Sequence, residues 1–212
     1  MRKTGLLARF FFAAAVCTAR IPLVQNNIVL VGLMGAGKTT IGRLLAKAFS
    51  LPFIDSDHEI EARTGVKVPI IFEIEGEEGF RLREAQIVAE LAQRQGLVIA
   101  TGGGAVLNPV SRMALHACGV VVYLHAQPND LWLRTRHDQN RPLLRANDPL
   151  ARLAELYSQR DPLYREAAHL VVDTGRQSPR LLAGKIEQQL REIWLKLETV
   201  QTRHSEPNCA SI

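Results

Sequence analysis

Residues 32–39 read Gly-Leu-Met-Gly-Ala-Gly-Lys-Thr and match the pattern GxxxxGK[ST] at every fixed position. An apolar run, Ile28–Val31, precedes them, and an amphipathic stretch begins at Lys38. In a strand, loop and helix of this kind, backbone N–H groups converge on phosphate oxygens and the helix N-terminus adds positive potential. Lys38 can reach the β- and γ-phosphates of a nucleotide, and the Thr39 hydroxyl can ligate magnesium. A glycine-rich turn that merely joins strand to helix is the alternative, but the full match in this setting favours a phosphate site.

On both sides of this loop, short apolar runs alternate with amphipathic stretches. The runs predict buried parallel strands at Ile28–Val31, Phe53–Asp55, Leu97–Ala100, Val120–Leu124 and Leu170–Asp173. The amphipathic stretches predict helices at Lys38–Phe49, Glu77–Arg94, Pro109–His116, Asp130–His137, Leu150–Arg160 and Ser178–Lys196. One face of the last helix is apolar and is expected to cover the sheet; it carries Leu182, Ile186, Leu190, Ile193 and Leu197. This alternation predicts a parallel α/β sheet, which binds ligands beyond the carboxyl ends of its strands.

Length and composition fit an ordinary globular protein. The 212 residues are 47% apolar and 22% charged, which indicates one domain or at most two small ones. Three distant cysteines (Cys17, Cys118 and Cys209) without a CxxC pair argue against a disulfide framework or a zinc site, and fit a reducing compartment. The histidines are scattered and show no HExxH spacing.

The net charge of +5 is concentrated in the first quarter of the chain. Residues 1–54 contain seven Lys or Arg and no acidic residue, so the remainder is close to neutral. Only 6% of residues are aromatic, and no basic stripe is interleaved with them. The sequence therefore predicts neither a nucleic-acid partner nor a membrane partner.

Residues 1–26 are expected to form an extension outside the fold. Arg2 and Lys3 precede an apolar run, Leu6–Val16, which superficially resembles an export signal but is too short to span a bilayer and lacks a clear A-x-A site. A transit peptide is also conceivable, and an extended start ahead of the domain is the interpretation that we favour. We expect residues 27–198 to form the domain and 199–212 to form a polar tail.

Two further loops lie at predicted strand ends. Asp55-Ser-Asp57 closes the second strand, where one carboxylate can hold magnesium through water while the other reaches an acceptor hydroxyl. Asp57 could instead cap a helix. Thr101-Gly-Gly-Gly104 follows the third strand, and its lack of side chains allows a small polar ligand to approach the backbone; a flexible turn is the alternative.

Six motifs occur in one order along the chain: Gly35-Ala-Gly-Lys-Thr-Thr40, Asp55-Ser-Asp57, Gly79-Phe-Arg81, Thr101-Gly-Gly-Gly104, Arg141-Pro-Leu-Leu144 and Arg160-Asp-Pro-Leu-Tyr164. In order and spacing the chain resembles the shikimate kinase family over about residues 27–195. The resemblance implies a three-layer αβα P-loop kinase fold with a five-stranded parallel sheet, similar to nucleoside-monophosphate kinases. It also implies ATP-dependent phosphorylation of the 3-hydroxyl of shikimate, on the chorismate pathway to aromatic amino acids, by a cytoplasmic monomer.

The resemblance assigns roles to individual residues. The implied ATP site comprises Gly35, Ala36, Gly37, Lys38, Thr39, Thr40, Arg134, Arg141, Gln177 and Pro179. The implied shikimate site comprises Asp57, Arg81, Gly102, Gly103, Gly104 and Arg160, with the two arginines suited to a carboxylate. Thr39 and Asp55 are expected to hold one Mg²⁺ with ATP. Lys38, Asp57 and Arg141 are the expected catalytic residues, with Arg141 in a lid at residues 137–149.

Two other functions remain alternatives at this point. A gluconate kinase would share the phosphate loop and fold, but the triple glycine and the arginines at 81 and 160 suit a carboxylated ring. A nucleotide-dependent switch is a different class, and the Asn-Lys-x-Asp guanine motif of GTPase switches is absent from the sequence.

Overall fold

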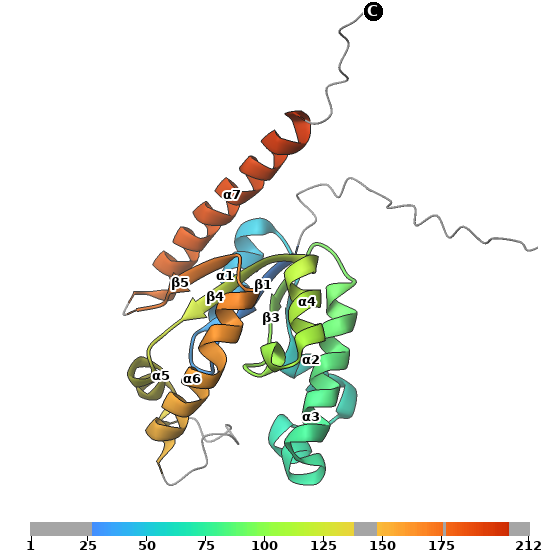
Figure 1. Cartoon of the computed structure of the whole chain (residues 1–212), viewed down its shortest axis with the longest axis vertical. Coiled ribbons are helices and arrows are strands. Elements are labelled where there is room, and N and C mark those ends of the chain that lie inside the picture. The colour runs from blue at the N-terminus through green and yellow to red at the C-terminus, as the bar shows by residue number, and fades with distance from the viewer. Residues whose placement is uncertain (1–26, 138–147, 176, 204–212) are drawn as a thin grey trace, which may run out of the picture.

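A single sheet of five parallel strands forms the centre of the computed structural model, which describes residues 27–137, 148–175 and 177–203 (Figure 1). The strands lie in the order β2-β3-β1-β4-β5. Their bounds are β1 Asn27–Val31, β2 Phe53–Asp55, β3 Val98–Ala100, β4 Gly119–His125 and β5 Leu170–Asp173. All five predicted strands are confirmed, and β1 is buried at each residue because neighbouring strands and helices enclose it.

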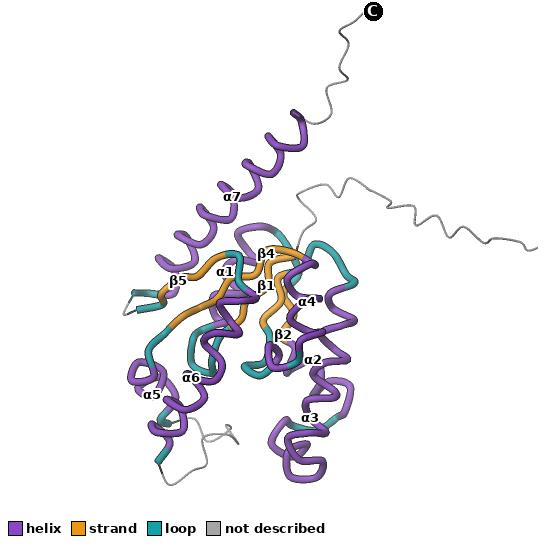
Figure 2. Tube along the Cα trace, viewed as in Figure 1, coloured by secondary structure: helices purple, strands orange, loops and turns teal. Residues whose placement is uncertain are grey.

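Helices cover both faces of the sheet and complete the predicted three layers (Figure 2). Their bounds are α1 Lys38–Phe49, α2 Ser56–Thr64, α3 Val68–Ala92, α4 Pro109–Cys118, α5 Pro128–Thr135, α6 Pro149–Ala167 and α7 Pro179–Arg203, with a short 3₁₀ turn, η2, at Ala105–Leu107. Helices α1 and α7 pack together on one face, whereas α3, α4 and α6 pack on the other. The connection after β1 leaves the middle of the sheet between β3 and β4, the position where parallel sheets bind ligands.

Helix α2 and the first part of α3 were not predicted from the sequence pattern. Helix α2 is strongly polar and buries only one large apolar side chain, that of Ile60, so it lacks the apolar periodicity that marks a helix. Helix α3 bends at Gly76, whose φ of 70° and ψ of −174° are not helical, and the predicted start at Glu77 matches only the segment after this bend. The two missed segments form one side of the cleft described below.

Helix α6 extends beyond its predicted end at Arg160 and continues through Pro162 to Ala167. Proline inside a helix costs about 3 kcal/mol, because it removes a hydrogen bond and clashes with the preceding turn. Burial of Leu156 before the proline and of Tyr164 after it offsets that cost, since both side chains belong to the core.

On helix α7, the predicted apolar face is buried where the structure describes it. Leu182, Ile186 and Leu190 are at most 3% exposed, and Ile193 packs against the core. Helix α7 packs against α1, so the two helices cover the same face of the sheet. The predicted position of Leu197 on this face lies outside the described side chains.

Candidate active site

The loop between β1 and α1 has a backbone that only glycine accommodates at three positions. Gly32, Gly35 and Gly37 have φ values of 141°, 81° and 96°. A Cβ atom on Gly32 would lie 2.7 Å from the carbonyl oxygen of Leu124, and one on Gly35 would lie 2.6 Å from Cγ2 of Thr135. The glycines therefore let the loop curl tightly over the sheet edge, as the phosphate-binding prediction requires.

Lys38 and Thr39 sit where this loop enters α1. The Lys38 ammonium donates to the carbonyl oxygens of Gly32 and Leu33, at 2.7 and 3.0 Å, so it lies across the mouth of the loop. The Thr39 hydroxyl donates to Oδ2 of Asp55 at 2.8 Å. The structure thus brings together the two residues predicted to hold the metal.

These oxygens fit a small divalent cation. A hydroxyl and a carboxylate are the hard donors that Mg²⁺ prefers, and Mg²⁺ usually keeps several waters while binding substrate phosphates. Among the residues that the structure describes, no group of three or more His, Cys, Asp or Glu side chains could enclose a metal. The site therefore suits a cation that arrives with a nucleotide and takes few protein ligands.

Asp55 and Asp57 have separate roles in the structure. Oδ1 of Asp55 accepts from the backbone N–H of Asp57 at 3.1 Å, so Asp55 is the N-cap of α2. The alternative that Asp57 caps this helix is wrong. Asp57 instead lines the cleft beside Gly102, where a Cβ atom would lie 2.6 Å from its Oδ1.

The triple glycine after β3 makes room for protein side chains. A Cβ atom on Gly102 would overlap the Glu84 carboxylate, and one on Gly104 would overlap the Arg81 guanidinium. Gly103 contributes its carbonyl oxygen, which accepts from Nη1 of Arg160 at 3.2 Å and from the Tyr164 hydroxyl. The loop is thus a packed surface and not a flexible turn, and it positions both arginines.

Arg81 and Arg160 place two guanidinium groups in one cleft. Arg160 is 3% exposed, and its Nε has no hydrogen-bond partner within the described part of the chain. Burial lowers the pKa of Arg160, and the like charge of Arg81 lowers it further. A buried cation with an unused donor favours an anion beside it, which supports the prediction that this pair receives a carboxylate.

Glu84 is a site residue that the sequence interpretation missed. It is 2% exposed, and its Oε2 accepts from Nη1 of Arg81 at 2.6 Å. Burial and the negative charge of Asp57 raise the pKa of Glu84 to about 7, although Arg81 and Arg160 oppose the shift. A signal was present in the sequence, because residues three apart on a helix are neighbours and Arg81 already belonged to the site.

This raised pKa predicts a pH-dependent loss of stability. Between 4.5 and about 7 the folded chain holds a proton on Glu84 that the unfolded chain has released, so the unfolding free energy falls as pH rises through this window. We expect Glu84→Gln, which cannot titrate, to melt at a higher temperature than wild type above this window and to approach wild type below it. Thermal melts over that pH range measure the gap. Glu78→Gln, an exposed change on the same helix, is the control, and a gap that stays constant with pH would contradict the prediction.

Of the three predicted adenine residues, Arg134 lines the cleft at the phosphate loop, whereas Gln177 and Pro179 are not among the residues that line it. Nη1 of Arg134 donates to the carbonyl oxygen of Gly35 at 3.4 Å and to the Thr174 hydroxyl at 3.0 Å, so Arg134 ties this loop to the chain after β5. Gln177 accepts from the Lys185 ammonium, and Pro179 is the first residue of α7. Arg141 and most of the predicted lid, residues 138–147, lie outside the described residues.

One cleft of about 680 Å³ joins the phosphate loop to the two arginines. Its lining includes Gly35, Gly37, Lys38, Thr39, Thr40, Asp55, Asp57, Arg81, Gly102, Gly103, Gly104, Arg134 and Arg160, all predicted from the sequence. Phe72 and Phe80 also line it, with ring centroids 4.7 Å apart, and were not predicted. The cleft therefore brings the phosphate loop and the two arginines to one space.

A search for membrane-spanning helices gives no candidate in the part of the chain that the structure describes.

Comparison with protein families gives a match to one model, described as "Shikimate kinase", over residues 34–191. A curated shikimate kinase from Burkholderia thailandensis is 61% identical over 183 residues, which cover 86% of this chain and 98% of the relative. A second, from Nitrosospira multiformis, is 62% identical over 165 residues, which cover 78% of this chain and 85% of the relative.

Solved structures give the same result. A shikimate kinase from Acinetobacter baumannii in complex with shikimate superposes with a TM-score of 0.77 at 50% identity, covering 79% of this chain and 93% of that one. A shikimate kinase from Aquifex aeolicus superposes with a TM-score of 0.67 at 32% identity, covering 78% and 96%. The predicted family resemblance and the predicted fold are both confirmed.

Proposed function

The chain belongs to the shikimate kinase family, and we infer that it transfers the γ-phosphoryl group of ATP to the 3-hydroxyl of shikimate. The observation that carries this function is the single cleft in which the phosphate loop and the two arginines face one space. Both alternatives raised by the sequence, a gluconate kinase and a nucleotide-dependent switch, are set aside by the family assignment. The activity places the protein on the route to chorismate.

Shikimate occupies the part of the cleft lined by Asp57, Arg81, Arg160 and the triple glycine. Arg81 and Arg160 pair with its carboxylate, because planar guanidinium groups match that anion in geometry and charge. Asp57 lies beside the glycine loop and accepts a hydrogen bond from the hydroxyl that is phosphorylated. The complex of the Acinetobacter baumannii relative with shikimate supports an acceptor site in this fold.

ATP occupies the phosphate loop, with its adenine toward Arg134, Gln177 and Pro179. Phosphoryl transfer requires in-line positioning and stabilisation of charge on the transferred group, more than covalent help from the protein. Lys38 leaves its loop carbonyls to contact the phosphates, and Arg141 closes on them from the lid. Asp57 orients the hydroxyl and takes its proton late in the reaction.

A divalent cation accompanies the nucleotide, and we propose Mg²⁺, one per chain, held by Thr39 and Asp55. When bound, the cation neutralises phosphate charge. The hydrogen bond of 2.8 Å from the Thr39 hydroxyl to Asp55 supports this placement, because it shows that the two oxygens lie close enough to contact the same cation.

We further propose that the enzyme is a cytoplasmic monomer in which residues 27–198 form the domain. The three cysteines without a CxxC pair support a reducing compartment. Residues 1–26 then form an N-terminal extension and 199–212 a C-terminal tail, and this tail begins within the last turns of α7, which ends at Arg203.

A coupled assay for ADP tests the function. Purified protein with ATP and Mg²⁺ is expected to release ADP when shikimate is added and to stay near its basal rate with gluconate. Equal ADP release with shikimate, with gluconate and with no acceptor would contradict the proposal.

A further inference from the structure

Arg81 is held by two carboxylates from its own helix, and they occupy different parts of its guanidinium. Glu84 takes Nη1, whereas a single oxygen of Glu77, Oε1, accepts from both Nε at 3.3 Å and Nη2 at 2.8 Å. The edge formed by Nε and Nη2 is one that can pair with a carboxylate through two parallel hydrogen bonds. Glu77 therefore sits on a donor edge that a carboxylated substrate needs.

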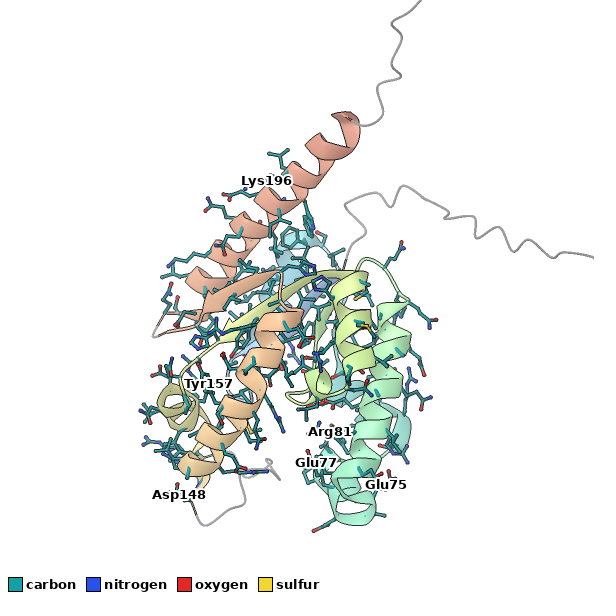
Figure 3. The ribbon with its side chains drawn as sticks, in the orientation of Figure 1. Glu75, Glu77, Arg81, Asp148, Tyr157 and Lys196 are labelled. Atoms are coloured by element: carbon teal, nitrogen blue, oxygen red, sulfur yellow. The ribbon has the colours of Figure 1, made fainter. Side chains whose placement is uncertain are left out.

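The two carboxylates differ in their access to water. The side chain of Glu84 is 3% exposed, and that of Glu77 is 46% exposed. Figure 3 labels Glu77 and Arg81 on the side of α3 that faces α6 and Glu75 on the other side, and Arg81 lines the cleft. Glu77 can swing into solvent at little cost, whereas Glu84 would have to leave a buried site.

We propose that Glu77 holds the edge of Arg81 that the substrate carboxylate uses, so that shikimate displaces Glu77 from Arg81 on binding. This inference rests on the proposed function and names a residue that sets substrate affinity. Before shikimate binds, Glu77 offsets the charge of Arg81, whose guanidinium lies over Gly104. Glu84 remains paired with Arg81 throughout, so the arginine does not move when the exchange occurs. Glu77 acts through Arg81 and is a positioning residue.

The exchange predicts that removing the Glu77 charge strengthens acceptor binding. An exposed ion pair contributes about 0.2–1 kcal/mol, so we expect Glu77→Gln to lower the shikimate KM by about 1.4- to 5-fold. The kcat and the ATP KM are expected to stay at wild-type values, because neither the hydroxyl nor the nucleotide contacts Glu77. Steady-state kinetics at fixed ionic strength measures this split.

Two further variants make the test specific. Glu77→Asp is expected to keep a near-wild-type KM, because Asp161 and Arg165 show that aspartate can hold an arginine four residues later in this chain. Glu78→Gln removes the same charge from the next, exposed position and is expected to leave the KM unchanged. An unchanged or raised KM in Glu77→Gln, or an equal fall in Glu78→Gln, would overturn the inference. A wild-type protein that shows no shikimate-dependent turnover would instead overturn the proposed function.

Discussion

Replacing Asp57 by Asn is expected to lower kcat with shikimate by about 10²- to 10⁴-fold, the range that a positioned proton acceptor contributes. Asn keeps the size of the side chain and its ability to accept one hydrogen bond, but it cannot take the hydroxyl proton. ATP binding is expected to persist, because in the proposed function the nucleotide binds the phosphate loop, to which Asp57 does not belong. Steady-state turnover together with calorimetric titration of ATP separates the two effects.

Asp55→Asn is the matched comparison for this variant. Asn also caps helices well, so α2 is expected to stay folded, but the neutral side chain holds a divalent cation less tightly. We therefore expect Asp55→Asn to raise the Mg²⁺ concentration needed for activity, and Asp57→Asn to leave that concentration unchanged. Near-normal turnover in Asp57→Asn would remove this residue from the mechanism.

Local sequence patterns were sufficient to predict the strands of the sheet and the phosphate loop. Each β-strand is a short apolar run between polar or glycine residues, and a buried parallel strand requires that pattern. The glycines at 32, 35 and 37 are required by backbone conformation, which the sequence records directly. The places of Lys38, Thr39 and Asp55 after predicted strands were therefore enough to predict that they meet at one edge of the sheet.

The other wall of the cleft depends on contacts that sequence patterns do not contain. Helix α2 buries only one large apolar side chain, that of Ile60, and the bend at Gly76 separates two segments that a pattern of apolar residues does not join. Glu84 is buried only because Gly102 leaves space for its carboxylate, a contact between α3 and the loop after β3. Such pairings arise from the tertiary fold, which explains why Arg81 and Arg160 were found through the family motifs while Glu84, Phe72 and Phe80 were missed. Asp57 was found earlier, from its place at the end of a predicted strand.

Lys38→Met is expected to lower kcat by about 10²- to 10³-fold, because removing one preorganised donor to a developing charge has an effect of this size. The loss has a catalytic and not a structural origin. Lys38 begins α1, where the helix dipole disfavours a cation, so the helix does not depend on its charge. Its ammonium contacts the carbonyl oxygens of Gly32 and Leu33, and in the proposed function it exchanges them for phosphate oxygens when ATP binds. We therefore expect the melting temperature to change little while the ATP KM rises.

Lys47→Met provides the control on the same helix. Lys47 is exposed in the last turn of α1, where a cation is favourable to the dipole but far from the phosphate loop. This variant is expected to keep wild-type kcat and to lose a small amount of stability. A different result would contradict this: Lys38→Met melts well below wild type while Lys47→Met does not. The Lys38 ammonium would then be needed to keep the phosphate loop folded. The lost activity of Lys38→Met would reflect that loss of structure and not a missing contact to the transferred phosphoryl group.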